Sequence, residues 1–207
     1  MKKINATFIS FSSIILYLGI GAIIMYFAGM SNEGLSITIN ATARISLIFF
    51  ALIFVASPLH TIHPSGLTRW LLKWRKEISL TFGITFLLSH MGIVYLLYDV
   101  NSPVTPKNIR LIDIYAGGLG IILLSAMVIT SFKKVRSTIS HRTWKTIHFV
   151  GLYYVWGVFI VDMVESYFIK DVKNAELLYI PFIIILSLAM GIRLHSIVMN
   201  RKTAEKH

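Results

Sequence analysis

The chain has 207 residues, of which 56% are hydrophobic and 14% charged, and it contains no cysteine. So few charges, with a mean hydropathy of +0.72, exclude an ordinary soluble domain. The absence of cysteine excludes disulfides, iron–sulfur clusters, thiolate-ligated haem and covalently attached c-type haem. The net charge of +11 is concentrated between apolar runs, so it indicates membrane topology, and no nucleic-acid partner is expected.

Six apolar runs predict an all-α integral membrane six-helix bundle, one transmembrane domain over residues 1–207. Each run approaches the roughly 20 residues that cross a bilayer. The first is too long for a signal-peptide core and is interpreted as an uncleaved helix. Pro58 is expected to break the second helix, whereas Pro181 lies in the first turn of the sixth. The expected spans are residues 8–28, 41–59, 78–97, 114–132, 142–163 and 177–199.

Basic residues gather in the predicted loops 60–76 and 133–145 and near both termini. The other loops carry most of the acidic residues. By the positive-inside rule, both termini are expected to be cytoplasmic. In the first basic loop, apolar residues at helical spacing predict a short, separate helix lying in the cytoplasmic interface. These residues are Leu67, Trp70, Leu71 and Trp74.

His90 interrupts the third apolar run, where an imidazole is costly unless it is paired or bound. On its helix face, small residues such as Gly83 are expected to leave space for a flat group. One interpretation makes His90 a ligand. The other, equally weighted, has it hydrogen-bonded to a neighbouring helix, for example through Ser89 or Thr85.

His148 begins the fifth span, and Trp144 lies one turn before it on the same face. An interfacial histidine and a ligand are again equal alternatives. Two histidines on two membrane helices, without a cage of carboxylates, favour haem b over other metals. Trp144 is expected to line such a site. Arg44 and Arg75 are candidates to pair with haem propionates, although snorkelling to lipid phosphate is the alternative for each.

Two stretches resemble a known family. Residues 75–90, RKEISLTFGITFLLSH, resemble the third-helix motif of the ferric reductase-like transmembrane domain. Residues 127–134, MVITSFKK, and 141–156, HRTWKTIHFVGLYYVW, resemble the end of its fourth helix and the start of its fifth. The resemblance covers about residues 40–165. The chain resembles the haem-binding subunit of the periplasmic methionine sulfoxide reductase system, a member of this family, and it looks most similar to bacterial members that carry this domain alone.

The resemblance implies a bundle in the bacterial inner membrane that holds b haem between the third and fifth helices. The family's histidines on these helices map to His90 and His148. Two-haem members carry a second histidine about fourteen residues away on each helix, where this chain has Lys76 and Asp162. Two complete bis-histidine haems are therefore not expected.

The two histidines also differ in expected depth. Measured from the nearest preceding lysine, His90 lies about 21 Å along its helix and His148 about 4.5 Å along its own. A single iron bound by both would therefore require tilted or offset helices. The alternatives are a haem on one histidine, two half-ligated sites, or no haem.

The leading hypothesis is a haem b-binding membrane electron-transfer protein, an oxidoreductase component of ferric reductase-like type. Electrons would pass from a quinol or a separate flavoprotein to a periplasmic acceptor, because no dinucleotide-binding motif is present. Any quinone or flavin would then be supplied by a partner. The alternative is a non-enzymatic membrane anchor or regulatory subunit with degraded haem sites. A small transporter or proton conductor is the third hypothesis, but the spans carry few charged residues for one.

Overall fold

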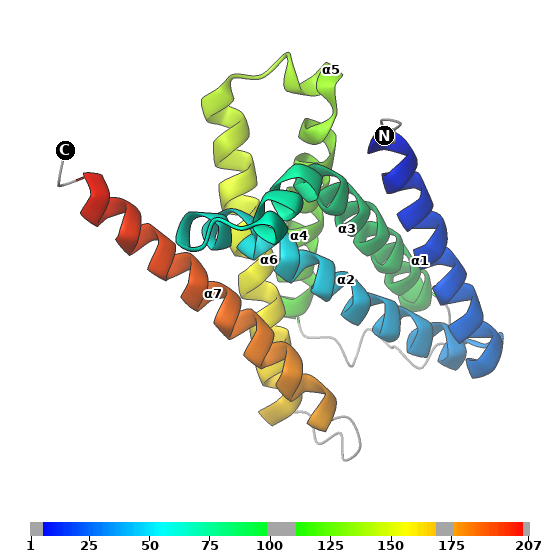
Figure 1. The fold of residues 1–207 in the computed structure, drawn as a ribbon. Coiled ribbons are helices and arrows are strands. Elements are labelled where there is room, and N and C mark those ends of the chain that lie inside the picture. The colour runs from blue at the N-terminus through cyan, green and yellow to red at the C-terminus, as the bar shows by residue number, and fades with distance from the viewer. Residues whose placement is uncertain (1–5, 99–110, 169–175, 205–207) are drawn as a thin grey trace.

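The computed structural model describes residues 6–98, 111–168 and 176–204, and these ranges are helical apart from short turns (Figure 1). The all-α prediction is confirmed for this part of the chain. The helices are α1 Ala6–Ala28, α2 Asn32–Ile62, α3 Gly66–Tyr98, α4 Leu111–Ser131, α5 Lys133–Arg136, α6 His141–Phe168 and α7 Glu176–Ala204.

Five of these helices, α2, α3, α4, α6 and α7, contain stretches long and apolar enough to cross a bilayer. This confirms a multi-pass membrane protein. In α1 the apolar stretch found among the described residues is shorter, Ser12–Ala28. The first expected span, residues 8–28, and the orientation of the termini stay predictions.

The arrangement of the helices centres on α2, which packs against α1, α3 and α7. On the other side of the molecule, α6 packs against α4 and α7, and α3 also contacts α4. In Figure 1, α1 and α7 lie on opposite sides of α2. The helices that carry His90 and His148, α3 and α6, are therefore joined mainly through α4, which packs against both.

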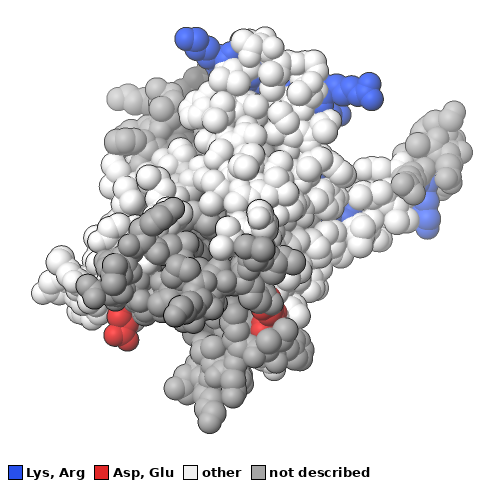
Figure 2. Space-filling model, turned by 180° about the vertical axis from the view of Figure 1, so that it is seen from behind, with Lys and Arg blue, Asp and Glu red and all other residues white. Residues whose placement is uncertain are grey.

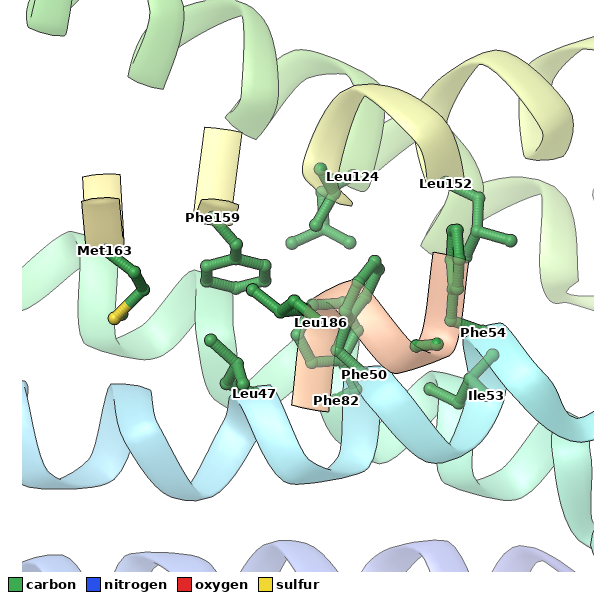
Figure 3. Packing of buried hydrophobic residues seen from close by; sticks show 12 residues of the cluster. Leu47, Phe50, Ile53, Phe54, Phe82, Leu124, Leu152, Phe159, Met163 and Leu186 are labelled. Atoms are coloured by element: carbon green, nitrogen blue, oxygen red, sulfur yellow. The ribbon is translucent and has the colours of Figure 1, made fainter. Parts of the chain in front are cut away.

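The core lies where α2, α3 and α6 meet, and it is rich in phenylalanine (Figure 3). The ring of Phe50 lies 5.3 Å from the rings of both Phe82 and Phe159. Leu124 of α4 and Leu186 of α7 complete the cluster. Tilted aromatic pairs of this kind contribute about 0.5–1.5 kcal/mol each beyond their buried area. This core positions α6 against α2 and α3.

A seam of buried hydroxyls joins α1, α2 and α3. The Tyr17 and Ser89 hydroxyls lie 2.7 Å apart, and the Ser46 hydroxyl donates to the Tyr17 oxygen at 3.2 Å. Thr42 and Thr85 lie along the same seam, within 3.4–3.5 Å of Ser89 and Ser46 respectively. Small polar residues let membrane helices approach closely, and their hydroxyls bond across the interface. The seam therefore docks α1 onto the other two helices.

Pro58 does not break α2, so that prediction is wrong: the helix continues to Ile62. Proline has no N–H and cannot donate to the carbonyl of Phe54, four residues earlier. In the structure, Nη1 of Arg193 on α7 donates to the Phe54 oxygen at 2.8 Å. The helix tolerates the proline because a side chain from another helix supplies the missing donor.

The predicted interfacial helix is also not separate, because α3 runs without interruption from Gly66 to Tyr98. Ser65 and Thr68 exchange side-chain and backbone hydrogen bonds at its start, which caps the first turn. Residues 67–82 contain neither glycine nor proline. Nothing in this stretch ends the helix, so the expected boundary before residue 78 does not form.

Candidate functional site

A cavity of about 1260 Å³ is lined by residues of α2, α3, α4, α5, α6 and α7. Cofactor and ligand sites usually measure about 300–1,000 Å³, so a large ligand fits. Its described lining contains seven basic residues and no Asp or Glu. Figure 2 shows Lys and Arg at this end of the molecule and acidic residues at the opposite end. The basic lining residues are Arg75, Lys76, Lys133, Arg136, Arg142, Lys145 and Arg193.

His148 reaches this cavity from α6 and is only half-buried. The hydroxyl of Thr130 on α4 donates its one hydrogen to the Ala126 carbonyl at 2.7 Å. Its lone pair then accepts from Nε2 of His148 at 3.2 Å. This arrangement puts the imidazole proton on Nε2 and leaves the lone pair on Nδ1. Thr130, which also lines the cavity, thus orients the ring.

Aromatic rings and an arginine stack beside His148. The Trp144 ring centroid lies 4.4 Å from that of His148 and 6.1 Å from that of His141. The guanidinium of Arg136 on α5 lies 4.1 Å from the Trp144 centroid, and its Nη2 donates to Nδ1 of His141 at 2.8 Å. The stack connects the start of α6 to α5 within the lining of the cavity.

Arg193, which is not among the site residues predicted from the sequence, also lines the cavity. Besides donating to Phe54, its Nε donates to the Tyr153 hydroxyl at 2.9 Å. The guanidinium lies 4.5 Å and 4.8 Å from the ring centroids of these two residues. One signal in the sequence could have found it. Arg193 is a charge within the apolar stretch Tyr179–Asn200, where a cation needs a partner.

The cavity brings together three of the predicted site residues: Arg75, Trp144 and His148. His90 is not among its lining residues. It lies fifteen residues after Arg75 on the same helix, or about 22 Å along the axis. This separation agrees with the difference in depth that the sequence predicts between the two histidines.

Around His90, the structure differs from the expectation of an open space. A Cβ added at Gly83 would meet the Val128 side chain of α4, so α4 fills the predicted gap. The His90 ring lies 4.1 Å from that of Phe86, and its Nδ1 lies 2.9 Å from the Phe86 carbonyl oxygen. The prediction of room at Gly83 is wrong, because helix packing closes it.

Two residues outside the cavity, the candidate Arg44 and His60, have local contacts. Arg44 lies 5.3 Å from the Tyr179 ring centroid and does not line the cavity. Nδ1 of His60 lies 2.9 Å from the Thr68 hydroxyl oxygen, a contact that ties the end of α2 to the start of α3. In the described ranges, no group of three or more His, Cys, Asp or Glu residues is placed to hold a metal ion.

The fold and this site define a multi-pass membrane protein with a basic cavity that is lined by two histidines, His141 and His148. The family of the ferric reductase like transmembrane component matches residues 41–160, more than half of the chain, so the chain belongs to that family. The family match indicates a membrane electron-transfer component. No curated protein and no solved structure was found to match significantly. The closer resemblance to the methionine sulfoxide reductase subunit stays a prediction.

Proposed function

We propose that the chain is a bacterial inner-membrane electron-transfer protein that binds haem b in the basic cavity. It would pass electrons from a quinol or a separate flavoprotein to a periplasmic acceptor. One observation carries the proposal. In a member of the ferric reductase-like family, His148 enters a large cavity together with Arg75 and Arg193.

The lining of the cavity fits a haem. Apolar side chains from four helices, Ile53 of α2 and Leu152 of α6 among them, provide walls for a flat hydrophobic group. Arg75 and Arg193 offer positive charge for its two propionates. Bound haem would supply one-electron iron chemistry, which side chains lack.

In this proposal His148 holds the iron, and Thr130 sets the tautomer and the orientation of its ring. Arg75 and Arg193 balance the negative charge. Trp144, stacked on His148, shields the imidazole on one side.

His90 is proposed as a ligand of a separate site rather than of the same iron. Its Nδ1–H donates to the Phe86 carbonyl, which leaves the lone pair on Nε2. Metal-binding histidines typically have this arrangement. Because Val128 closes the space at Gly83, a flat group beside His90 would require α4 to shift.

The second candidate function is a membrane anchor or regulatory subunit whose haem sites have degraded. The observation that favours it is the closed packing around His90, together with its position outside the cavity. In this case the fold is retained while the redox function is lost.

The test is the haem content per chain and the reduced-minus-oxidised spectrum after haem-replete expression. We expect wild type to bind haem and His148→Ala to lose most of it, while His90→Ala keeps the haem of the cavity. His63→Ala is the matched control, because His63 is exposed at the end of α2. Wild-type protein without a Soret band contradicts the proposal, as does full haem retention in His148→Ala. Partner assembly that persists without haem would then favour the anchor function.

A further inference from the structure

Two buried hydrogen-bond donors on residues that line the basic cavity have no acceptor among the described residues. They are Nη1 of Arg136 and Nε1 of Trp144. Both groups can only donate. The Arg136 guanidinium carbon lies 4.1 Å from the Trp144 ring centroid. This stacking contact holds the two unsatisfied donors close to one another.

A buried donor without an acceptor is unfavourable, and native structures contain few of them. Nearby basic residues, including Lys133 and Lys145, raise the positive potential at the same place. The described lining contains no carboxylate to neutralise it. An oxyanion would accept hydrogen bonds from these two donors. It would also neutralise the positive charge around them.

We propose that the cavity binds a phosphate group beside the stacked side chains of Arg136 and Trp144. The planar guanidinium suits a tetrahedral oxyanion because it donates through more than one N–H, and the indole adds a neutral donor. A phosphate carries several acceptor oxygens, which matches a site with several cations better than a single carboxylate does. The phosphate belongs either to an anionic lipid headgroup or to a soluble phosphate ester.

The phosphate site adjoins the proposed haem site, because Trp144 stacks on His148, but forming it does not require the haem. Arg136 lies on α5 and Trp144 in the first turn of α6, whereas His148 lies a turn further along α6. The Arg136 guanidinium is already anchored by His141, so the site is formed before the ligand arrives.

Calorimetric titration of the full-length protein in a phosphate-free maltoside detergent tests this inference. One arm uses glycerol phosphate and the other short-chain phosphatidylglycerol. We expect Arg136→Gln to weaken binding roughly tenfold or more, because a charge-assisted bond is lost. Trp144→Phe keeps an aromatic ring but removes the N–H, and should weaken binding about threefold to tenfold. Arg136→Lys should fall between wild type and Arg136→Gln.

Arg69→Gln is the matched control, because it removes one exposed positive charge outside the cavity. Binding of the lipid alone identifies a headgroup site, and comparable binding of glycerol phosphate identifies a soluble ester. The proposal is overturned if neither probe binds, if Arg136→Gln binds like wild type, or if Arg69→Gln loses as much. Haem content is measured in parallel to distinguish failure of this proposal from failure of the proposed function. Arg136→Gln should retain whatever haem the wild type binds.

Discussion

Pro58 and Arg193 are expected to be energetically coupled although they are distant in sequence. Pro58 deprives the Phe54 carbonyl of its donor within α2, and Arg193 supplies another at 2.8 Å. Phe54 is fully buried, so its carbonyl oxygen has little access to other partners. Replacing Arg193 by the unbranched, apolar methionine should therefore destabilise the fold chiefly by leaving this oxygen without a donor.

The magnitude follows from the contacts. An orphaned buried carbonyl costs about 1–3 kcal/mol. Loss of the cation–π contacts with Phe54 and Tyr153 adds about 0.5–2 kcal/mol. Arg193→Met alone should thus lower the free energy of unfolding by about 1.5–5 kcal/mol.

Pro58→Ala restores a backbone N–H that can donate to the Phe54 oxygen, so it should partly rescue Arg193→Met. Hydrogen bonds within membrane proteins contribute about 0.6 kcal/mol on average and up to about 1.7. A charge-assisted bond lies toward the upper end, so we expect a coupling energy of about 1–2 kcal/mol.

The assay is a double-mutant cycle of unfolding free energies in detergent micelles. The control is Arg69→Met, which should change stability by no more than about 0.5 kcal/mol because Arg69 is exposed. Additive effects of Pro58→Ala and Arg193→Met, within about 0.5 kcal/mol, would refute the idea that the arginine compensates for the proline.

Two further predictions concern helix packing, and both are measured by thermal unfolding in micelles. Gly83→Ala should cost about 1–3 kcal/mol because its Cβ would meet the stiff, β-branched Val128, whereas Gly151→Ala should cost less because it meets the flexible end of Met127. Equal costs at the two glycines would contradict this reasoning. Tyr17→Phe should cost about 0.6–1.7 kcal/mol by removing the hydroxyl that joins α1 to the polar seam. An unchanged unfolding temperature would mean that the seam does not hold α1.

Most of the helical elements could be predicted from the sequence, because a bilayer imposes a length of apolar chain that is a local property. Five of the expected spans correspond to helices that could cross a membrane. The motifs around His90 and His148 were also sufficient to indicate the family, which the match over residues 41–160 confirms. Helix boundaries were less predictable, as the continuous α3 shows.

The site was only partly predictable. Arg75, Trp144 and His148 were expected and lie around one cavity, but Arg44 and His90 lie outside it. Arg193 was missed because a lone arginine in an apolar run does not reveal which partner it finds.

The sequence by itself determined a basic, multi-pass helical protein of the ferric reductase-like family with two candidate histidines. Only the tertiary structure decided that Arg193 meets the carbonyl freed by Pro58, that Val128 fills the space at Gly83, and that Arg136 lies over Trp144. The physical reason is the range of the interactions. Hydropathy acts along one helix and can be read from neighbouring residues, whereas the pairing of donors, cavities and charges depends on how separate helices pack.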